Sequence, residues 1–156
     1  MSRPDLPNAE TSLPELTIRD QFDDHLAAYL SDRLTEHNLE VTGIRDGRGL
    51  TVVARDEAGQ IAGGLTGFTW GGLCKVRLLW VRADLRGQGL GGRLMDAAEA
   101  EAAARGCRQV VLETHSFQAP DFYQARGYRI VGTVEDYPQG YQYYTLVKKL
   151  GEPLNE

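Results

Sequence analysis

The sequence holds few of the residues from which disulfide frameworks and metal sites are built. Its 156 residues include two cysteines, Cys74 and Cys107, and three histidines, His25, His37 and His115. Two cysteines make no disulfide framework, and the histidines have no metal-ligand spacing with the cysteines. We therefore expect no metal site, and we expect both cysteines to pack as small apolar side chains.

Long apolar runs and an excess of positive charge are also missing. No run of about 18 apolar residues occurs and the first residues hold no apolar signal core, so we expect a cytoplasmic protein with no membrane partner. Lys and Arg number 17 against 22 Asp and Glu, which gives a net charge of −5. This acidity argues against a nucleic-acid partner.

The residues that are present are typical of one ordinary globular domain. Apolar residues make up 42% of the chain and charged residues 25%, and the length allows a single domain with an adequate core. We expect a loose N-terminal leader at residues 1–13, where prolines are frequent, one domain at residues 14–150 and a short C-terminal tail at residues 151–156.

The most informative stretch has the pattern of a strand, a glycine-rich turn and a helix. Leu-Leu-Trp-Val at 78–81 predicts a buried strand, and an Ala- and Glu-rich run to Arg105 predicts the helix. Glycines stand between them at positions 87, 89, 91 and 92. They allow a diphosphate to approach the free N–H groups of the first helical turn, where Arg86 or Arg93 adds positive potential.

Two other phosphate-binding motifs fit this turn poorly. A Walker loop requires Gly-Lys-Ser/Thr where this chain has Gly92, Arg93 and Leu94. Gly87, Gly89 and Gly92 match the Rossmann spacing G-x-G-x-x-G, but the turn lies past the middle of the chain, behind strands of antiparallel pattern. A tight turn alone would require fewer glycines and no flanking arginines.

Two motifs together resemble those of the GNAT superfamily of N-acetyltransferases. Arg86-x-x-Gly89-x-Gly91 resembles its acetyl-CoA motif R/Q-x-x-G-x-G/A, and Ser116-x-x-Ala119-x-x-Phe122-Tyr123-x-x-x-Gly127-Tyr128 resembles a second motif at the expected distance downstream. The resemblance covers about residues 15–150, and the pair of motifs is far more specific than either motif alone.

The resemblance implies an α/β (α+β) fold, with a mixed, mostly antiparallel central sheet, helices on both faces and a GNAT-like acyl-CoA N-acyltransferase architecture. In that fold the sheet splits between two parallel strands, and the pantetheine arm of acetyl-CoA pairs with strand backbone in the opening. The cofactor-binding residues implied here are Leu79, Trp80, Val81, Arg86, Gly87, Gln88, Gly89, Leu90, Gly91, Gly92, Arg93, Ser116 and Tyr123. Ser116 stands where the family commonly has Asn, so it offers fewer hydrogen bonds.

Tyr123 matches the family tyrosine that lies near the sulfur and protonates the leaving thiolate. Acyl transfer to an amine passes through a tetrahedral intermediate, and the departing thiolate requires a proton or strong solvation. The alternative is that Phe122 and Tyr123 only anchor the helix on the core.

The general base stays open at this stage. Some family members carry a glutamate on the strand before the turn, but that position is Lys75 here. Glu113 and His115 are candidates at the end of the next strand, because alternation places them on one face, and Glu135 or Asp136 lie beyond it. A water chain with no single base is a further alternative.

The remaining pattern predicts local elements. We expect a strand at 16–19, a helix capped by Asp20, hairpin turns at 56–59 and 71–72, and a parallel strand at 109–112. A short helix from Pro120 and strands near 128–135 and 141–150 follow. In the main helix we expect Glu99 to face water, and we expect the pair at 148–149 to form a solvated sheet edge.

These observations favour transfer of an acetyl group from acetyl-CoA to a primary amine by direct attack in a ternary complex. The alternatives are a non-catalytic CoA-binding module and a transferase for a longer acyl group. We expect a small-molecule or peptide amine as the acceptor, and a polyamine, an aminoglycoside-like antibiotic, an amino acid and a protein N-terminus all stay open. The tyrosines at 137, 141, 143 and 144 either line its pocket or pack the strands, and an exposed sheet edge allows a homodimer.

Overall fold

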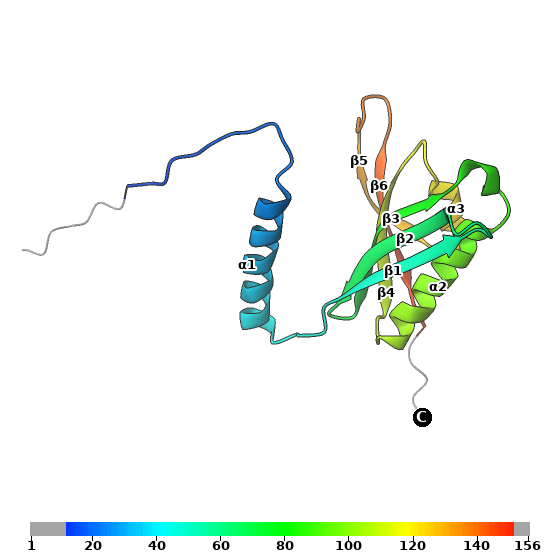
Figure 1. Ribbon diagram of the computed structural model, residues 1–156, viewed down its shortest axis with the longest axis horizontal. Helices are drawn as coiled ribbons and strands as arrows, with labels where there is room; N and C mark the ends of the chain where they lie inside the picture. Colours follow the sequence, from blue (N-terminus) through cyan, green and yellow to red (C-terminus); the bar gives the residue numbers. More distant parts are fainter. Residues whose placement is uncertain (1–11, 152–156) are drawn as a thin grey trace, which may run out of the picture. The chain divides into compact units, whose positions relative to one another are not determined.

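A computed structural model of the protein describes residues 12–151, which fall into two compact units that divide between His37 and Asn38. The predicted leader and tail lie almost entirely outside the described residues. The second unit is built on a six-stranded sheet of order β1-β2-β3-β4-β6-β5 (Figure 1). This confirms the mixed, mostly antiparallel α/β class.

Helix α1, Asp24–Thr42, begins in the first unit. The carboxylate of Asp23 accepts a hydrogen bond from the backbone N–H of Leu26 at 2.8 Å and so caps the helix, in place of the Asp20 that the sequence predicted. The strand predicted at 16–19 is wrong, because those residues have no regular structure and no partner strand to pair their backbone. No helix among residues 12–151 is long and apolar enough to cross a membrane.

Strands β1, Arg48–Arg55, β2, Ile61–Trp70, and β3, Leu73–Val81, form an antiparallel meander. Both predicted hairpin turns are confirmed. At the first turn, the carboxylate of Asp56 accepts hydrogen bonds from two backbone N–H groups, and Gly59 takes the left-handed conformation at φ 79°. The meander delivers β3 to the glycine-rich turn.

A β-bulge interrupts the β2–β3 ladder at Gly67. Thr66 pairs with Leu78 while Gly67 pairs with Val76, so Arg77 is the extra residue. The backbones approach so closely here that a Cβ on Gly67 would lie 2.0 Å from the carbonyl oxygen of Lys75. The position therefore requires glycine.

Gly67→Ala is expected to destabilise the fold by about 3 kcal/mol, because the backbone rather than a flexible side chain must move. For a chain of this size this corresponds to a Tm about 6–12 °C lower, measured by thermal unfolding. Gly49→Ala is the matched control, since a Cβ at Gly49 meets nothing within 4 Å. A Gly67→Ala protein that melts at the wild-type temperature would contradict the close approach.

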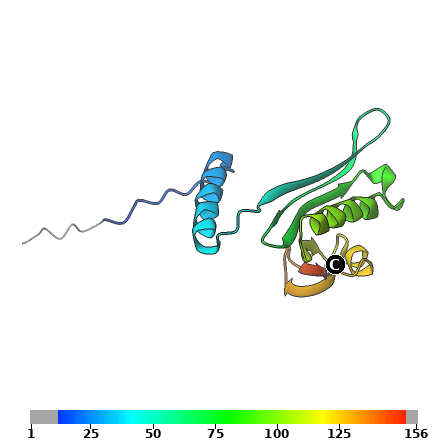
Figure 2. The same cartoon turned by 90° about the horizontal axis from the view of Figure 1, so that it is seen from below.

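Helix α2, Leu90–Ala104, packs along the sheet (Figure 2) and buries Leu94, Met95, Ala98 and Ala102. Gly106 ends it at φ 82°, as predicted. The prediction that Glu99 faces water is wrong. Its carboxylate accepts hydrogen bonds at 2.8 Å from the Tyr128 hydroxyl and from Lys148 Nζ, which ties α2 to the C-terminal strands.

Strand β4, Gln109–His115, pairs parallel to β3, and α3, Pro120–Ala125, follows it. Strands β5, Arg129–Val134, and β6, Tyr143–Lys149, complete the sheet. Strand β6 lies between β4 and β5, but its pairing with β5 ends at Val147, so residues 148–149 pair with β4 alone. Lys149 is exposed there, as a solvated edge predicts, whereas Lys148 binds Glu99.

Successive side chains of β4 point to opposite faces of the sheet. Val110, Leu112 and Thr114 are buried, and the first two join the hydrophobic core with Met95 of α2 and Tyr123 of α3. The intervening residues, which include Glu113 and His115, therefore point to the opposite face. Chemical groups on the two faces can meet only where the sheet opens.

Candidate active site

The sheet opens between β3 and β4. Their ladder ends at the pair Lys75–Val111, although β3 continues to Val81 and β4 to His115. Beyond that pair, the backbone of β3 pairs only with β2: Leu79, Trp80 and Val81 lie opposite Leu65, Gly64 and Gly63. The other edge of this segment is left without a ladder partner, as an extended ligand backbone would require.

The glycine-rich turn follows β3 directly. A 3-10 turn, η1, Ala83–Leu85, leads into it, and Gly87 and Gly89 adopt left-handed φ values of 73° and 84° with open space where a Cβ would stand. Gly89 is the N-cap of α2, with no side-chain cap and no acidic residue in the first turn. The first N–H groups of the helix are therefore not used by a capping side chain, an arrangement that suits an anion.

The other two glycines of the turn serve packing. A Cβ on Gly91 would lie 3.6 Å from the ring of Phe122, and one on Gly92 would lie 3.3 Å from the guanidinium of Arg126, so small residues let α2 approach α3. Arg86 donates a hydrogen bond from Nε to the carbonyl oxygen of Val81 at 3.0 Å, while Arg93 is exposed at the start of the helix. Both arginines border the turn, as the sequence indicated.

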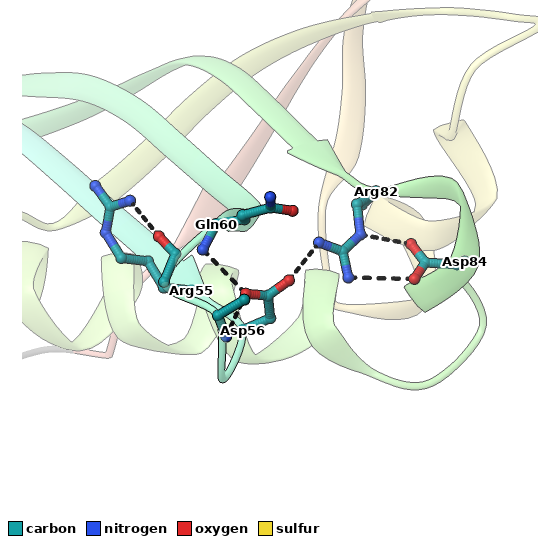
Figure 3. Close-up of polar contacts among 7 residues, drawn as sticks. Arg55, Asp56, Gln60, Arg82 and Asp84 are labelled. Atoms are coloured by element: carbon teal, nitrogen blue, oxygen red, sulfur yellow. Dashed lines mark hydrogen bonds and ion pairs between the residues drawn. The ribbon is translucent and has the colours of Figure 1, made fainter.

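Arg82, which sequence reasoning missed, fixes the turn to the rest of the sheet. Its guanidinium donates hydrogen bonds to Asp84 at 2.7 Å and to Asp56 at 2.8 Å (Figure 3). Hydrogen bonding to Arg82 lowers the pKa of both carboxyls, and the two carboxylates raise the pKa of the guanidinium. The β1–β2 turn and the β3–α2 connection are thereby held together.

A hollow of about 600 Å³ lies beside the glycine-rich turn. It is bordered by the β1–β2 hairpin and by the start of α2, with Arg55, Gln88 and Arg93 among its lining residues. Neither Tyr123 nor the polar end of β4 lines it. The hollow therefore adjoins the predicted phosphate end of the site rather than the reacting end.

Tyr123 belongs to the hydrophobic core on the α2 and α3 face of the sheet. It is 7% exposed, and its ring packs edge-on against Phe122 and Tyr128 at centroid distances of 5.0 and 5.7 Å. Among residues 12–151 no side chain bonds its hydroxyl. Burial raises the pKa of the Tyr123 phenol, so it carries its proton at neutral pH.

Glu113 and Lys75 form an ion pair across the point where β3 and β4 separate. Both side chains are 24% exposed, and they lie on the face opposite Tyr123. Lys75, which stands where some members of the resembling family carry a glutamate, thus binds a carboxylate supplied by the neighbouring strand. Burial, and next the negative charge of Glu113, raise the pKa of Tyr143 on the same face.

His115 lies at the end of β4 with one ring nitrogen engaged. Nδ1 is 2.9 Å from the backbone carbonyl oxygen of Tyr137. Because a carbonyl oxygen can only accept, Nδ1 must carry the hydrogen, and in the neutral ring the lone pair lies on Nε2. No residue among 12–151 hydrogen-bonds to that Nε2.

Ser116 continues the β4–β6 ladder. Its N–H donates to the carbonyl of Gln142 at 2.8 Å, and its Oγ accepts from the Gln142 N–H at 3.1 Å. The hydroxyl hydrogen is left for another acceptor. Its predicted contact with the cofactor stays a prediction.

The cysteines do not offer a nucleophile. Cys74 is 1% exposed, and burial raises its thiol pKa to about 11; burial also raises the pKa of Cys107. Both thiols are therefore protonated at neutral pH. Within the described part of the chain, no group of three or more His, Cys, Asp or Glu side chains is arranged to hold a metal ion.

The split sheet and the glycine-rich turn at the start of α2 agree with the acyltransferase class that the sequence motifs indicated. The family model for the acetyltransferase (GNAT) domain matches residues 47–130, and the chain belongs to this family. It is 42% identical over 144 residues to blasticidin-S acetyltransferase of Streptomyces morookaense, covering 89% of this chain and 98% of that protein. An acetyltransferase of Agrobacterium fabrum is 31% identical over 132 residues, covering 85% and 96%.

Solved structures agree with this assignment. An acetyltransferase from Bacillus cereus is 30% identical with a TM-score of 0.73, covering 86% of this chain and 98% of that chain. Aminoglycoside 6′-N-acetyltransferase, solved with coenzyme A, shares the fold at 21% identity with a TM-score of 0.59, covering 88% and 98%.

Proposed function

We propose that the protein transfers the acetyl group of acetyl-CoA to a primary amine of a small cationic acceptor by direct attack in a ternary complex. The observation that carries this proposal is the opening beyond Lys75–Val111, with the Tyr123 phenol on one side of the sheet and Glu113 and His115 on the other. Similarity to blasticidin-S acetyltransferase over nearly all of both chains supports a small-molecule acceptor.

The cofactor would lie along the turn and the opening. The first N–H groups of α2, with Arg86 and Arg93, would bind the diphosphate. The unpaired edge of Leu79–Val81 would take the pantetheine amides as an added strand, after Arg86 releases the Val81 carbonyl. Acetyl-CoA supplies the thioester, and these contacts direct its carbonyl toward the opening.

Two protein groups assist the chemical step, one at the leaving sulfur and one at the attacking amine. The neutral amine attacks the carbonyl carbon, the C–S bond breaks, and the sulfur leaves as a thiolate. Tyr123 donates a hydrogen bond to that thiolate. A thiol of pKa about 8.5 is a stronger acid than a phenol whose pKa is raised, so the phenol keeps its proton. Tyr123 therefore stabilises the thiolate through the hydrogen bond that it donates.

His115 is our proposal for the group that takes the amine proton. Its Nε2 lone pair is free of the described residues and its ring is held by the Tyr137 carbonyl. Glu113 is less suited, because Lys75 already occupies its carboxylate. With both thiols protonated at neutral pH, no acyl-cysteine takes part.

The test is free-thiol release from acetyl-CoA with a panel that includes blasticidin S, an aminoglycoside, a polyamine and an amino acid. We expect release that depends on one class of small cationic amine, and mass spectrometry should find the acceptor heavier by one acetyl group. Binding of acetyl-CoA without release for any amine would favour the CoA-binding module instead. Faster release with a longer acyl-CoA would favour the alternative donor.

A further inference from the structure

Five rings meet at the end of β4. His115 stacks on Phe117 at a centroid distance of 5.0 Å and an interplanar angle of 13°. It also contacts Tyr143 at 4.7 Å and Tyr137 at 5.2 Å, and Phe117 contacts Tyr141 edge-on at 5.0 Å. We name these five residues the His115 cluster.

Three separate segments build the His115 cluster. His115 and Tyr143 lie opposite each other in the β4–β6 ladder, so their side chains share a face. Phe117 follows β4, and the β5–β6 connection brings the other two rings, closed by a hydrogen bond from the Tyr137 N–H to the Tyr141 carbonyl at 3.0 Å. The fold therefore holds these rings in fixed relation.

The cluster is not part of the hydrophobic core. Phe117 and Tyr137 are each 54% exposed and Tyr141 is 47% exposed, and none of the five belongs to the core cluster. Tyr144, next along β6, packs on the core instead. Aromatic rings that are ordered yet half exposed are typical of a binding surface.

The charge around the His115 cluster is negative. Glu113 lies two residues before His115 on the same face, and Glu135 and Asp136 are exposed in the connection that carries Tyr137. Lys75 offsets one of these charges. Rings beside carboxylates favour a ligand that combines a flat ring with a cation.

We propose that the His115 cluster is the acceptor subsite, and that it selects a primary amine joined by a short linker to a flat unsaturated ring. This inference rests on the proposed function, in which His115 takes the proton of the attacking amine. The ring of the acceptor stacks among Phe117, Tyr137 and Tyr141, and its ammonium is drawn toward the carboxylates before it loses a proton.

The experiment compares two acceptors of similar size, 2-phenylethylamine and 2-cyclohexylethylamine, in thiol release from acetyl-CoA. The flat ring is expected to give a kcat/KM about fivefold higher, through KM. Phe117→Leu and Tyr141→Leu should bring this ratio close to one, whereas Phe117→Tyr and Tyr141→Phe, which keep the rings, should retain it. An unchanged KM for acetyl-CoA reports that each variant is folded.

The ratio of the two kcat/KM values distinguishes a loss of ring binding from a displacement of His115, because a displaced base would slow the reaction of both amines equally. A wild type that uses both acceptors equally well, or leucine variants that keep the preference, would overturn the subsite while leaving acetyl transfer intact. A wild type that releases thiol with no amine of any class would overturn the proposed function, and the subsite with it.

Discussion

Tyr123→Phe is expected to lower kcat about 100-fold while KM for acetyl-CoA stays within about twofold of wild type. In the proposed mechanism the phenol donates only to the leaving sulfur, so its contribution would arise in the transition state. Steady-state thiol release with the best acceptor of the panel measures both constants.

Tyr123→Phe is expected to change the rate of the chemical step without changing the stability of the fold. The ring, which packs on Phe122 and Tyr128, is retained, and no described residue bonds the hydroxyl that is lost, so unfolding should be unchanged. Tyr128→Phe is the matched control. It removes a hydrogen bond to Glu99 and should cost about 2 kcal/mol of stability with kcat within about twofold. A Tyr123→Phe enzyme with wild-type kcat would exclude the leaving-group role.

His115→Asn is expected to lower kcat/KM about 100-fold, the scale of a lost general base. The asparagine amide can replace Nδ1–H as donor to the Tyr137 carbonyl, so the loop should keep its anchor, while the Nε2 lone pair is gone. Thiol release at saturating acetyl-CoA measures the change.

Glu113→Gln is the comparison for this site, because it removes the other candidate base and its pairing with Lys75. We expect a loss under about tenfold. Imidazole added to the assay should partly restore the activity of His115→Ala, which a purely structural role of the histidine would not allow. A larger loss in Glu113→Gln than in His115→Asn would transfer the base to the carboxylate.

Local sequence predicted much of the cofactor end of the site. Gly87 and Gly89 take the left-handed conformations that their residue type allows, and the helix starts at Leu90 directly after them. These features depend on neighbours in sequence, where residue type and spacing act without help from the fold. The binding roles of these residues stay predictions for measurement to test.

The sequence-based predictions were wrong where the local structure depends on a partner far away in the chain. Glu99 has the helical spacing of a solvent-facing residue, but Tyr128 and Lys148, which come from the far end of the chain, bind its carboxylate. The strand at 16–19 has the right local pattern yet has no pairing partner.

The sequence by itself determined the family motifs, the glycine-rich turn and the side-chain alternation that places Glu113 and His115 on one face of the sheet. Only the tertiary structure decided that Lys75 binds Glu113 and that the Tyr137 carbonyl orients His115. These contacts join segments far apart in the chain, and they depend on the register of β3 and β6 against β4. Register is a non-local property, because one residue of slip turns every side chain of a strand to the other face.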